Sequence, residues 1–85
     1  MKVKKEILIQ KMGNTFVAYD NETSTLHEFN ETGFLILSGI EKKKNKQEII
    51  KEIVGKYKVS KDRAKGDYEE FVKILKTKGL IAEEE

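Results

Sequence analysis

The chain carries few of the side chains from which catalytic sites are built. It has no cysteine and a single histidine, His27, which excludes thiol nucleophiles and thiolate metal sites. A lone histidine in a strand-like segment is typical of a surface or half-buried position. The sequence also lacks a Gly-rich phosphate loop, a Ser/His/Asp set and a recognisable pair of carboxylates. We therefore predict no enzyme, no catalytic residues, no cofactor and no metal site.

Four carboxylates, Asp62, Asp67, Glu69 and Glu70, fall close together near the C-terminus. They lie in a segment with helical periodicity, where acidic residues pair with basic residues one turn away, as Arg63 does with Asp67. This pattern is typical of a solvated helix face.

A basic segment, residues 42–46, is the best nucleic-acid feature, because clustered ammonium groups contact phosphate. The whole chain has 17 Lys+Arg and 15 Asp+Glu, a net charge of only +2. A DNA-reading helix exposes Arg, Asn or Gln to base edges. The last predicted helix offers only Arg63 for this purpose, and its other side chains include several acidic ones that would repel phosphate. We predict no nucleic-acid partner and keep a winged-helix DNA-binding regulator as the alternative.

The sequence shows neither a membrane-spanning run nor a signal peptide, and we therefore expect a cytoplasmic protein. The longest apolar run, residues 34–37, is far shorter than the roughly 20 residues that cross a bilayer, and the N-terminus lacks the apolar core of a signal peptide. We predict no membrane partner. With 85 residues and no linker, the chain is expected to form a single domain, 1–85.

The first third of the chain has the composition of β-strands. Residues 7–9, 16–19 and 26–29 are rich in β-branched and aromatic types. Residues 13–14 (Gly-Asn) favour a tight hairpin, and residues 20–23 favour a second turn stabilised by Asx side chains. These signals predict a three-stranded antiparallel meander. Because Leu26 and Phe29 are three apart, both cannot face the core, and we expect Phe29 to be the buried one.

Helical signals begin at Asn30, an expected N-cap for a short apolar helix that Gly39 ends. Phe34 and Leu37 of this helix are expected in the core. Asn45 and Glu48 form a capping-box pattern.

The capping-box pattern starts a second helix at about residues 46–57, and Ser60 caps a third helix that Gly79 ends. The order βββααα predicts an α+β fold with helices packed on one side of the sheet, similar to a winged helix-turn-helix.

This arrangement suits peptide binding, since a strand edge offers backbone hydrogen bonds and an adjacent groove offers selectivity. If Thr25–Phe29 is the edge strand beside the third helix, an extended peptide would add to it. On that helix the flank of the core face carries Arg63, Asp67, Glu70 and Ile74. Ile74 either lines this groove or widens the buried face.

Three blocks of sequence resemble the PqqD family. Residues 29–37, FNETGFLIL, resemble its Leu-Asn-x-Thr-(Gly/Ala)-x-x-Ile stretch. Residues 67–75, DYEEFVKIL, followed by KGLI at 78–81, resemble its C-terminal stretch. Residues 48–60 fit between them. The resemblance as a whole covers about residues 16–81.

The resemblance implies a RiPP precursor recognition element, which binds the leader segment of a ribosomally made precursor peptide and delivers it to a modifying enzyme, often a radical SAM protein. The leader would add to the third strand and lie against the third helix. The product need not be pyrroloquinoline quinone. Together, the pattern and the resemblance predict these peptide-binding residues: Thr25, Leu26, His27, Glu28, Phe29, Arg63, Asp67, Phe71 and Ile74.

The chain departs from the family before the second helix. The family often has Asp-Gly there, whereas this chain has Ser38 and Gly39 followed by a lysine-rich loop. These lysines would attract an acidic leader or an acidic surface of the modifying enzyme.

Overall fold

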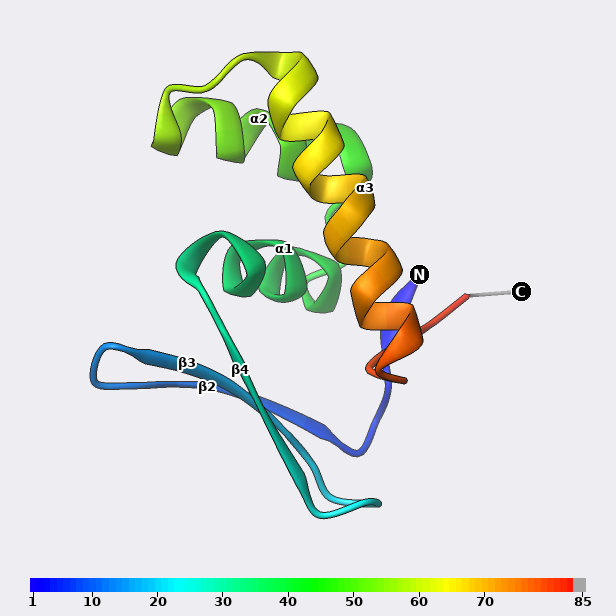
Figure 1. The fold of residues 1–85 in the computed structure, drawn as a ribbon. Coiled ribbons are helices and arrows are strands. Elements are labelled where there is room, and N and C mark those ends of the chain that lie inside the picture. The colour runs from blue at the N-terminus through cyan, green and yellow to red at the C-terminus, as the bar shows by residue number, and fades with distance from the viewer. Residues whose placement is uncertain (84–85) are drawn as a thin grey trace.

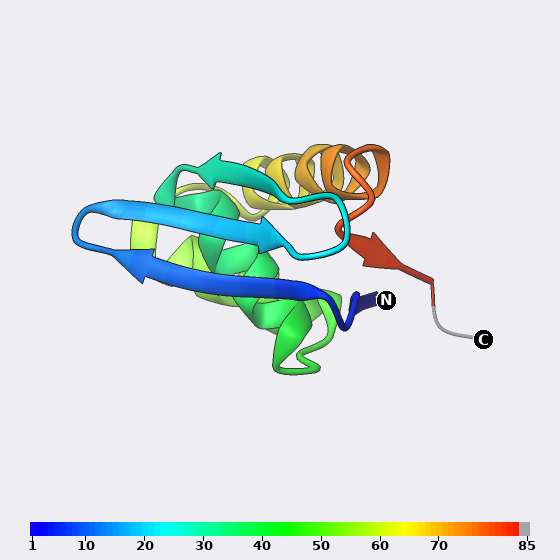
Figure 2. The ribbon, with the colours of Figure 1, turned by 90° about the horizontal axis from the view of Figure 1, so that it is seen from below.

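The computed structural model describes residues 1–83. A three-stranded antiparallel meander is formed by β2 (Ile7–Met12), β3 (Thr15–Asp20) and β4 (Thr25–Phe29). Strand β3 lies in the middle and pairs with both neighbours, so β2 and β4 are the two outer strands (Figure 2). The predicted meander is confirmed.

Both predicted turns have the expected local chemistry. Gly13 adopts a φ of +62° between β2 and β3, a conformation that glycine takes without a steric penalty. In the second turn, Asp20 Oδ1 accepts hydrogen bonds from the backbone N–H groups of Glu22 at 2.9 Å and Thr23 at 3.2 Å. Burial alone would raise the pKa of Asp20, but these bonds, with the charge of His27, hold that pKa below its usual value.

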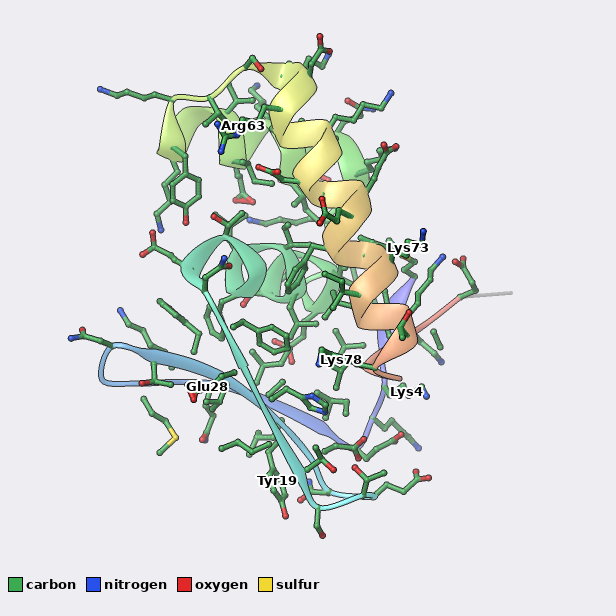
Figure 3. All side chains as sticks on the ribbon, viewed as in Figure 1. Lys4, Tyr19, Glu28, Arg63, Lys73 and Lys78 are labelled. Carbon is green, nitrogen blue, oxygen red and sulfur yellow. The ribbon has the colours of Figure 1, made fainter. Side chains whose placement is uncertain are left out.

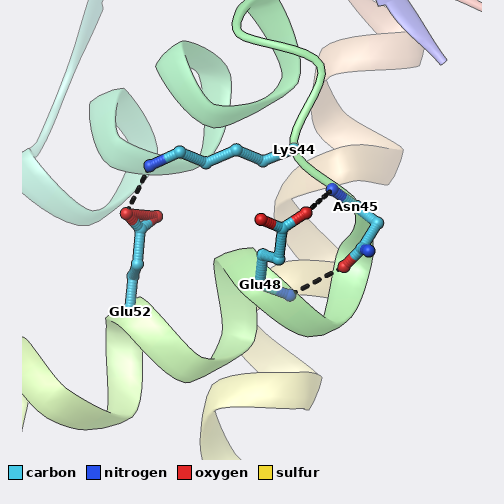
Figure 4. A network of polar contacts seen from close by, with 4 residues as sticks. All are labelled: Lys44, Asn45, Glu48 and Glu52. Atoms are coloured by element: carbon cyan, nitrogen blue, oxygen red, sulfur yellow. Dashed lines mark hydrogen bonds and ion pairs between the residues drawn. The ribbon is translucent and has the colours of Figure 1, made fainter.

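Three helices follow the sheet: α1 (Glu31–Glu41), α2 (Lys46–Tyr57) and α3 (Lys61–Thr77). The three predicted N-caps are all present. Asn30 and Ser60 accept hydrogen bonds from the backbone N–H groups three residues later, at 2.8 and 3.1 Å. Asn45 and Glu48 form the full capping box, with bonds of 2.9 and 3.0 Å (Figure 4). Each cap satisfies backbone donors that the first helical turn leaves unpaired.

The predicted end of the first helix is wrong. Helix α1 continues past Gly39 to Glu41, and the left-handed residue that follows it is Lys43, with a φ of +64°. Gly39 serves packing instead: a Cβ atom there would lie 2.8 Å from Cγ1 of Ile49. Its missing side chain lets α1 approach α2 closely. Gly79, with a φ of +73°, follows α3 as predicted.

A second, two-stranded sheet joins the ends of the chain. Strand β1 (Lys2–Val3) pairs antiparallel with β5 (Ile81–Ala82). This sheet was not predicted, because two-residue strands carry no periodicity. The architecture is nevertheless α+β, with a three-stranded antiparallel sheet and three helices as expected.

The helices pack on one face of the meander, and the core lies between them (Figures 1 and 2). Phe29 packs against this core while Leu26 is 59% exposed, which confirms the predicted orientation of β4. Leu37 is fully buried, but Phe34 is only half-buried, so its predicted place in the core is only partly correct. None of the helices described here is long and apolar enough to span a membrane.

Candidate peptide-binding groove

Strand β4 has one paired edge and one open edge. Its five residues pair with β3 from Asp20↔Thr25 to Phe16↔Phe29, and no strand within residues 1–83 pairs with its other side. An open edge presents unpaired backbone N–H and C=O groups, which form a template for another extended chain.

Helix α3 lies on the side of the meander where β4 has its open edge. Figure 2 shows β4 as the strand of the meander closest to α3. The ring of Phe29, the last residue of β4, meets the ring of Phe71 on α3 edge-on, with centroids 5.6 Å apart and planes at 76°. The His27 ring stacks against that of Phe29 at 6.5 Å. The contact between Phe29 and Phe71 holds the end of β4 against α3.

A hollow of about 410 Å³ opens beside α3, where β4 runs into α1. We call it the α1–α3 groove. It is lined by Asn30, Thr32, Gly33, Ile36, Arg63, Asp67, Glu70, Phe71 and Ile74. All four predicted helix residues therefore line one hollow. The five predicted residues of β4 do not line it, but form the strand that leads into it.

The groove combines an apolar wall with a charged rim. Ile74 is 40% exposed and lies in the lining, so the alternative that it only widens the buried core does not fit its position. The Arg63 guanidinium and the Asp67 carboxylate are 4.0 Å apart, which agrees with the predicted pair one turn apart. Glu70 is exposed and has no ion pair among residues 1–83. Arg63 lies near the start of α3 (Figure 3).

The part of the groove contributed by α1 was not predicted. The sequence predicts Asn30 only as a helix N-cap and Ile36 only as part of an apolar helix, and it assigns no binding role to Thr32 or Gly33. All four lie in the motif at residues 29–37 that carries the family resemblance. The motif was the available signal, since an N-cap residue must lie at the point where strand and helix meet.

Side chains alternate along β4. His27 and Phe29 are half-buried and face the helices, whereas Thr25, Leu26 and Glu28 are exposed. A peptide added beside β4 would show the same alternation, with every second side chain directed toward α3. Within the described part of the chain, no three His, Asp or Glu side chains are grouped as metal ligands would be.

Comparison with known proteins identifies the family of the chain. The sequence profile described as "Coenzyme PQQ synthesis protein D (PqqD)" matches residues 15–81. The chain therefore belongs to the PqqD family. No protein with a curated description matches it.

Two solved structures share the fold. One, titled "TbiB1 in Complex with the TbiA(beta) Leader Peptide", has a TM-score of 0.89 and 24% identity, and the match covers 100% of this chain and 99% of the other. A second, titled "Lasso peptide synthetase B1 complexed with the leader peptide", has a TM-score of 0.87 and 20% identity, covering 96% of each chain. The backbone arrangement is thus similar to that of two proteins solved with leader peptides.

Proposed function

We propose that this protein binds the leader segment of a ribosomally synthesised precursor peptide. The observation that carries the proposal is the open edge of β4 beside the α1–α3 groove. An extended peptide would continue the meander as a fourth strand, and its backbone would pair with that edge. Family membership and the two leader-bound structures of similar fold support the same function.

Selectivity would come from the groove. The exposed side of Ile74 and the ring of Phe71 suit an aliphatic or aromatic anchor of the leader. Arg63, Asp67 and Glu70 would contact polar groups flanking that anchor. We assign Thr25, Leu26, His27, Glu28 and Phe29 to the strand side of the peptide site.

The protein would act without chemistry of its own. By holding a leader while docked to a modifying enzyme, it raises the local concentration of the attached substrate segment at that enzyme. We propose a cytoplasmic protein of this kind, with a radical SAM enzyme as the expected partner. We propose that the three helices beside the antiparallel sheet are a winged-helix-like arrangement that binds through its open strand edge and not through a DNA-reading helix.

Binding measurements test the proposal against DNA binding. Synthetic peptides covering the N-terminal part of each short reading frame beside this protein's gene would be titrated calorimetrically, with scrambled peptides as controls. We expect one peptide to bind and to retain most of its affinity between 50 and 200 mM salt. Phosphate-dominated DNA binding loses about 10³- to 10⁵-fold over this range when six to ten phosphates are contacted. Tight duplex binding with that steep slope, and no peptide binding, would refute the function.

A further inference from the structure

A second hollow, of about 270 Å³, lies on the other side of α1. Its floor is formed by Phe16, Phe34 and Leu35, which are all half-buried. Its rim carries the side chains of Lys11, Lys42, Lys44 and Lys56. We call this surface the basic pocket.

Two of the floor residues, Phe16 and Phe34, form an aromatic pair. The rings of Phe16 and Phe34 lie 4.8 Å apart at 39°, and the Lys11 ammonium group lies 5.6 Å from the centre of the Phe16 ring. Half-buried aromatic faces beside a cation suit a partner side chain that is apolar and next to negative charge.

The rim has more positive than negative charge. Its four ammonium groups face two carboxylates, those of Glu31 and Glu52. Lys44 reaches across to bond Glu52, as Figure 4 shows. The carboxylate of Glu31 lies 3.9 Å from the Lys56 ammonium and also accepts a hydrogen bond from the Tyr57 hydroxyl at 2.9 Å.

Both carboxylates are therefore already engaged. Lys11 and Lys42 have no carboxylate partner among residues 1–83. Their charges remain available to an incoming anionic group.

The basic pocket is separate from the α1–α3 groove. Helix α1 directs Thr32, Gly33 and Ile36 to the groove, but Phe34 and Leu35 to the pocket. The groove adjoins the β4 side of the meander, whereas Lys11 of β2 brings the pocket to the opposite outer strand. A leader lying in the groove would leave the pocket open.

We propose that the basic pocket docks an acidic segment of the modifying enzyme, with one aromatic or aliphatic side chain of that segment seated on Phe16 and Phe34. The inference rests on the proposed function. Leader binding alone does not bring this protein to the modifying enzyme, whereas docking at the basic pocket would. Complementary charge would steer this encounter and fix its orientation. The lysine-rich loop that departs from the family pattern thereby acquires a role, through Lys42 and Lys44.

Peptide probes test the chemistry of the pocket. Three five-residue peptides, blocked at both ends, would be titrated into ¹⁵N-labelled protein: Glu-Glu-Phe-Glu-Glu, Glu-Glu-Ala-Glu-Glu and Lys-Lys-Phe-Lys-Lys. We expect the first to shift the amide signals of Phe16, Phe34 and Lys42, the second to bind several-fold more weakly, and the third to cause no shift. Equal shifts with the basic peptide, or shifts confined to the groove, would overturn the proposal. So would tighter binding of inorganic phosphate than of the first peptide.

Charge reversal then tests the partner. In the double variant Lys11→Glu and Lys42→Glu, the complex with the modifying enzyme encoded beside the precursor should weaken by about tenfold, since two attractive charges at the pocket become repulsive. The matched control is Lys65→Glu with Lys73→Glu. Both are exposed residues of α3 outside either hollow, and Lys73 lies toward the C-terminal half of the helix (Figure 3).

The two proposals fail in different ways. Leader affinity is measured separately and should be unchanged in both double variants, because neither alters the groove. Equal weakening of the enzyme complex by the control, or no weakening by the pocket variant, would refute the docking proposal. Failure of the unmodified protein to bind any leader peptide would instead refute the proposed function.

Discussion

Gly33 packs against the ring of Phe71. A Cβ atom added to Gly33 would lie 2.6 Å from both Cε1 and Cζ of that ring, a separation that requires one of the two groups to move. The same ring contacts Phe29 at the end of β4. The absence of a side chain at Gly33 therefore positions the residue that links the open strand to the groove.

Gly33→Ala should destabilise the fold and weaken leader binding, because the Phe71 ring must leave its place. Overpacking of this kind costs about 1 to 3 kcal/mol, measurable by denaturant unfolding. The matched control is Gly66→Ala, within α3, where a Cβ would meet nothing within 4 Å. That control should stabilise by about 0.4 to 1 kcal/mol. Equal stability of the two variants would show that Phe71 does not depend on Gly33.

Ile74→Asp separates recognition from folding. Ile74 is 40% exposed in the groove, so a charge there should change stability by about 1 kcal/mol or less but weaken leader binding at least tenfold through the peptide's apolar anchor. The neighbouring Leu75 is fully buried. Leu75→Ala should cost about 2 to 5 kcal/mol of stability. Unfolding of the Ile74 variant, or unchanged leader affinity in it, would contradict its assignment to the groove.

Phe34→Ala should cost less than the removal of a fully buried aromatic residue. Because Phe34 is half-buried against Phe16, we expect a loss of about 1 to 3 kcal/mol, below the 3 to 5 kcal/mol typical of a complete core phenylalanine. Thermal and denaturant unfolding measure this loss. Leu37→Ala, at a fully buried position of the same helix, provides the comparison and should be the more damaging change.

Asp20 should make the stability of the fold depend on pH in the acid range. Hydrogen bonds from Thr23 and Glu22 lower the pKa of Asp20 in the folded state. The ionised form thus stabilises the fold above the unfolded-state pKa, and this contribution is lost as the pH falls through the lower, folded-state pKa. Melting temperatures measured from pH 6 to pH 2 should fall less steeply for Asp20→Asn than for the unmodified chain. Parallel curves would contradict this role.

The elements that sequence reasoning predicted well are those with local causes. Asn30, Asn45 and Ser60 cap helices within three residues of themselves, and Gly13 makes its turn without distant partners. These signals therefore placed the meander and the starts of all three helices. The position of Ile74 followed from helical periodicity, because each residue of an α-helix turns by about 100°.

The features that were missed depend on contacts between distant segments. Strands β1 and β5 pair the two ends of the chain, and such short strands have no pattern of their own. Gly39 was expected to end a helix, but it packs against Ile49 of the next one. Similarly, Lys11 joins the basic pocket across more than thirty residues of sequence from Lys42. Only the tertiary fold brings these residues together.

Amide hydrogen exchange of β4, with and without bound leader peptide, tests the central claim most directly. The N–H groups of Thr25–Phe29 that point away from β3 have no strand partner within the described chain, so they should exchange readily in the free protein. If the leader adds as a fourth strand, their exchange should slow markedly on binding. A leader that binds but leaves this exchange unchanged, and turns helical in the complex, would contradict strand addition at β4.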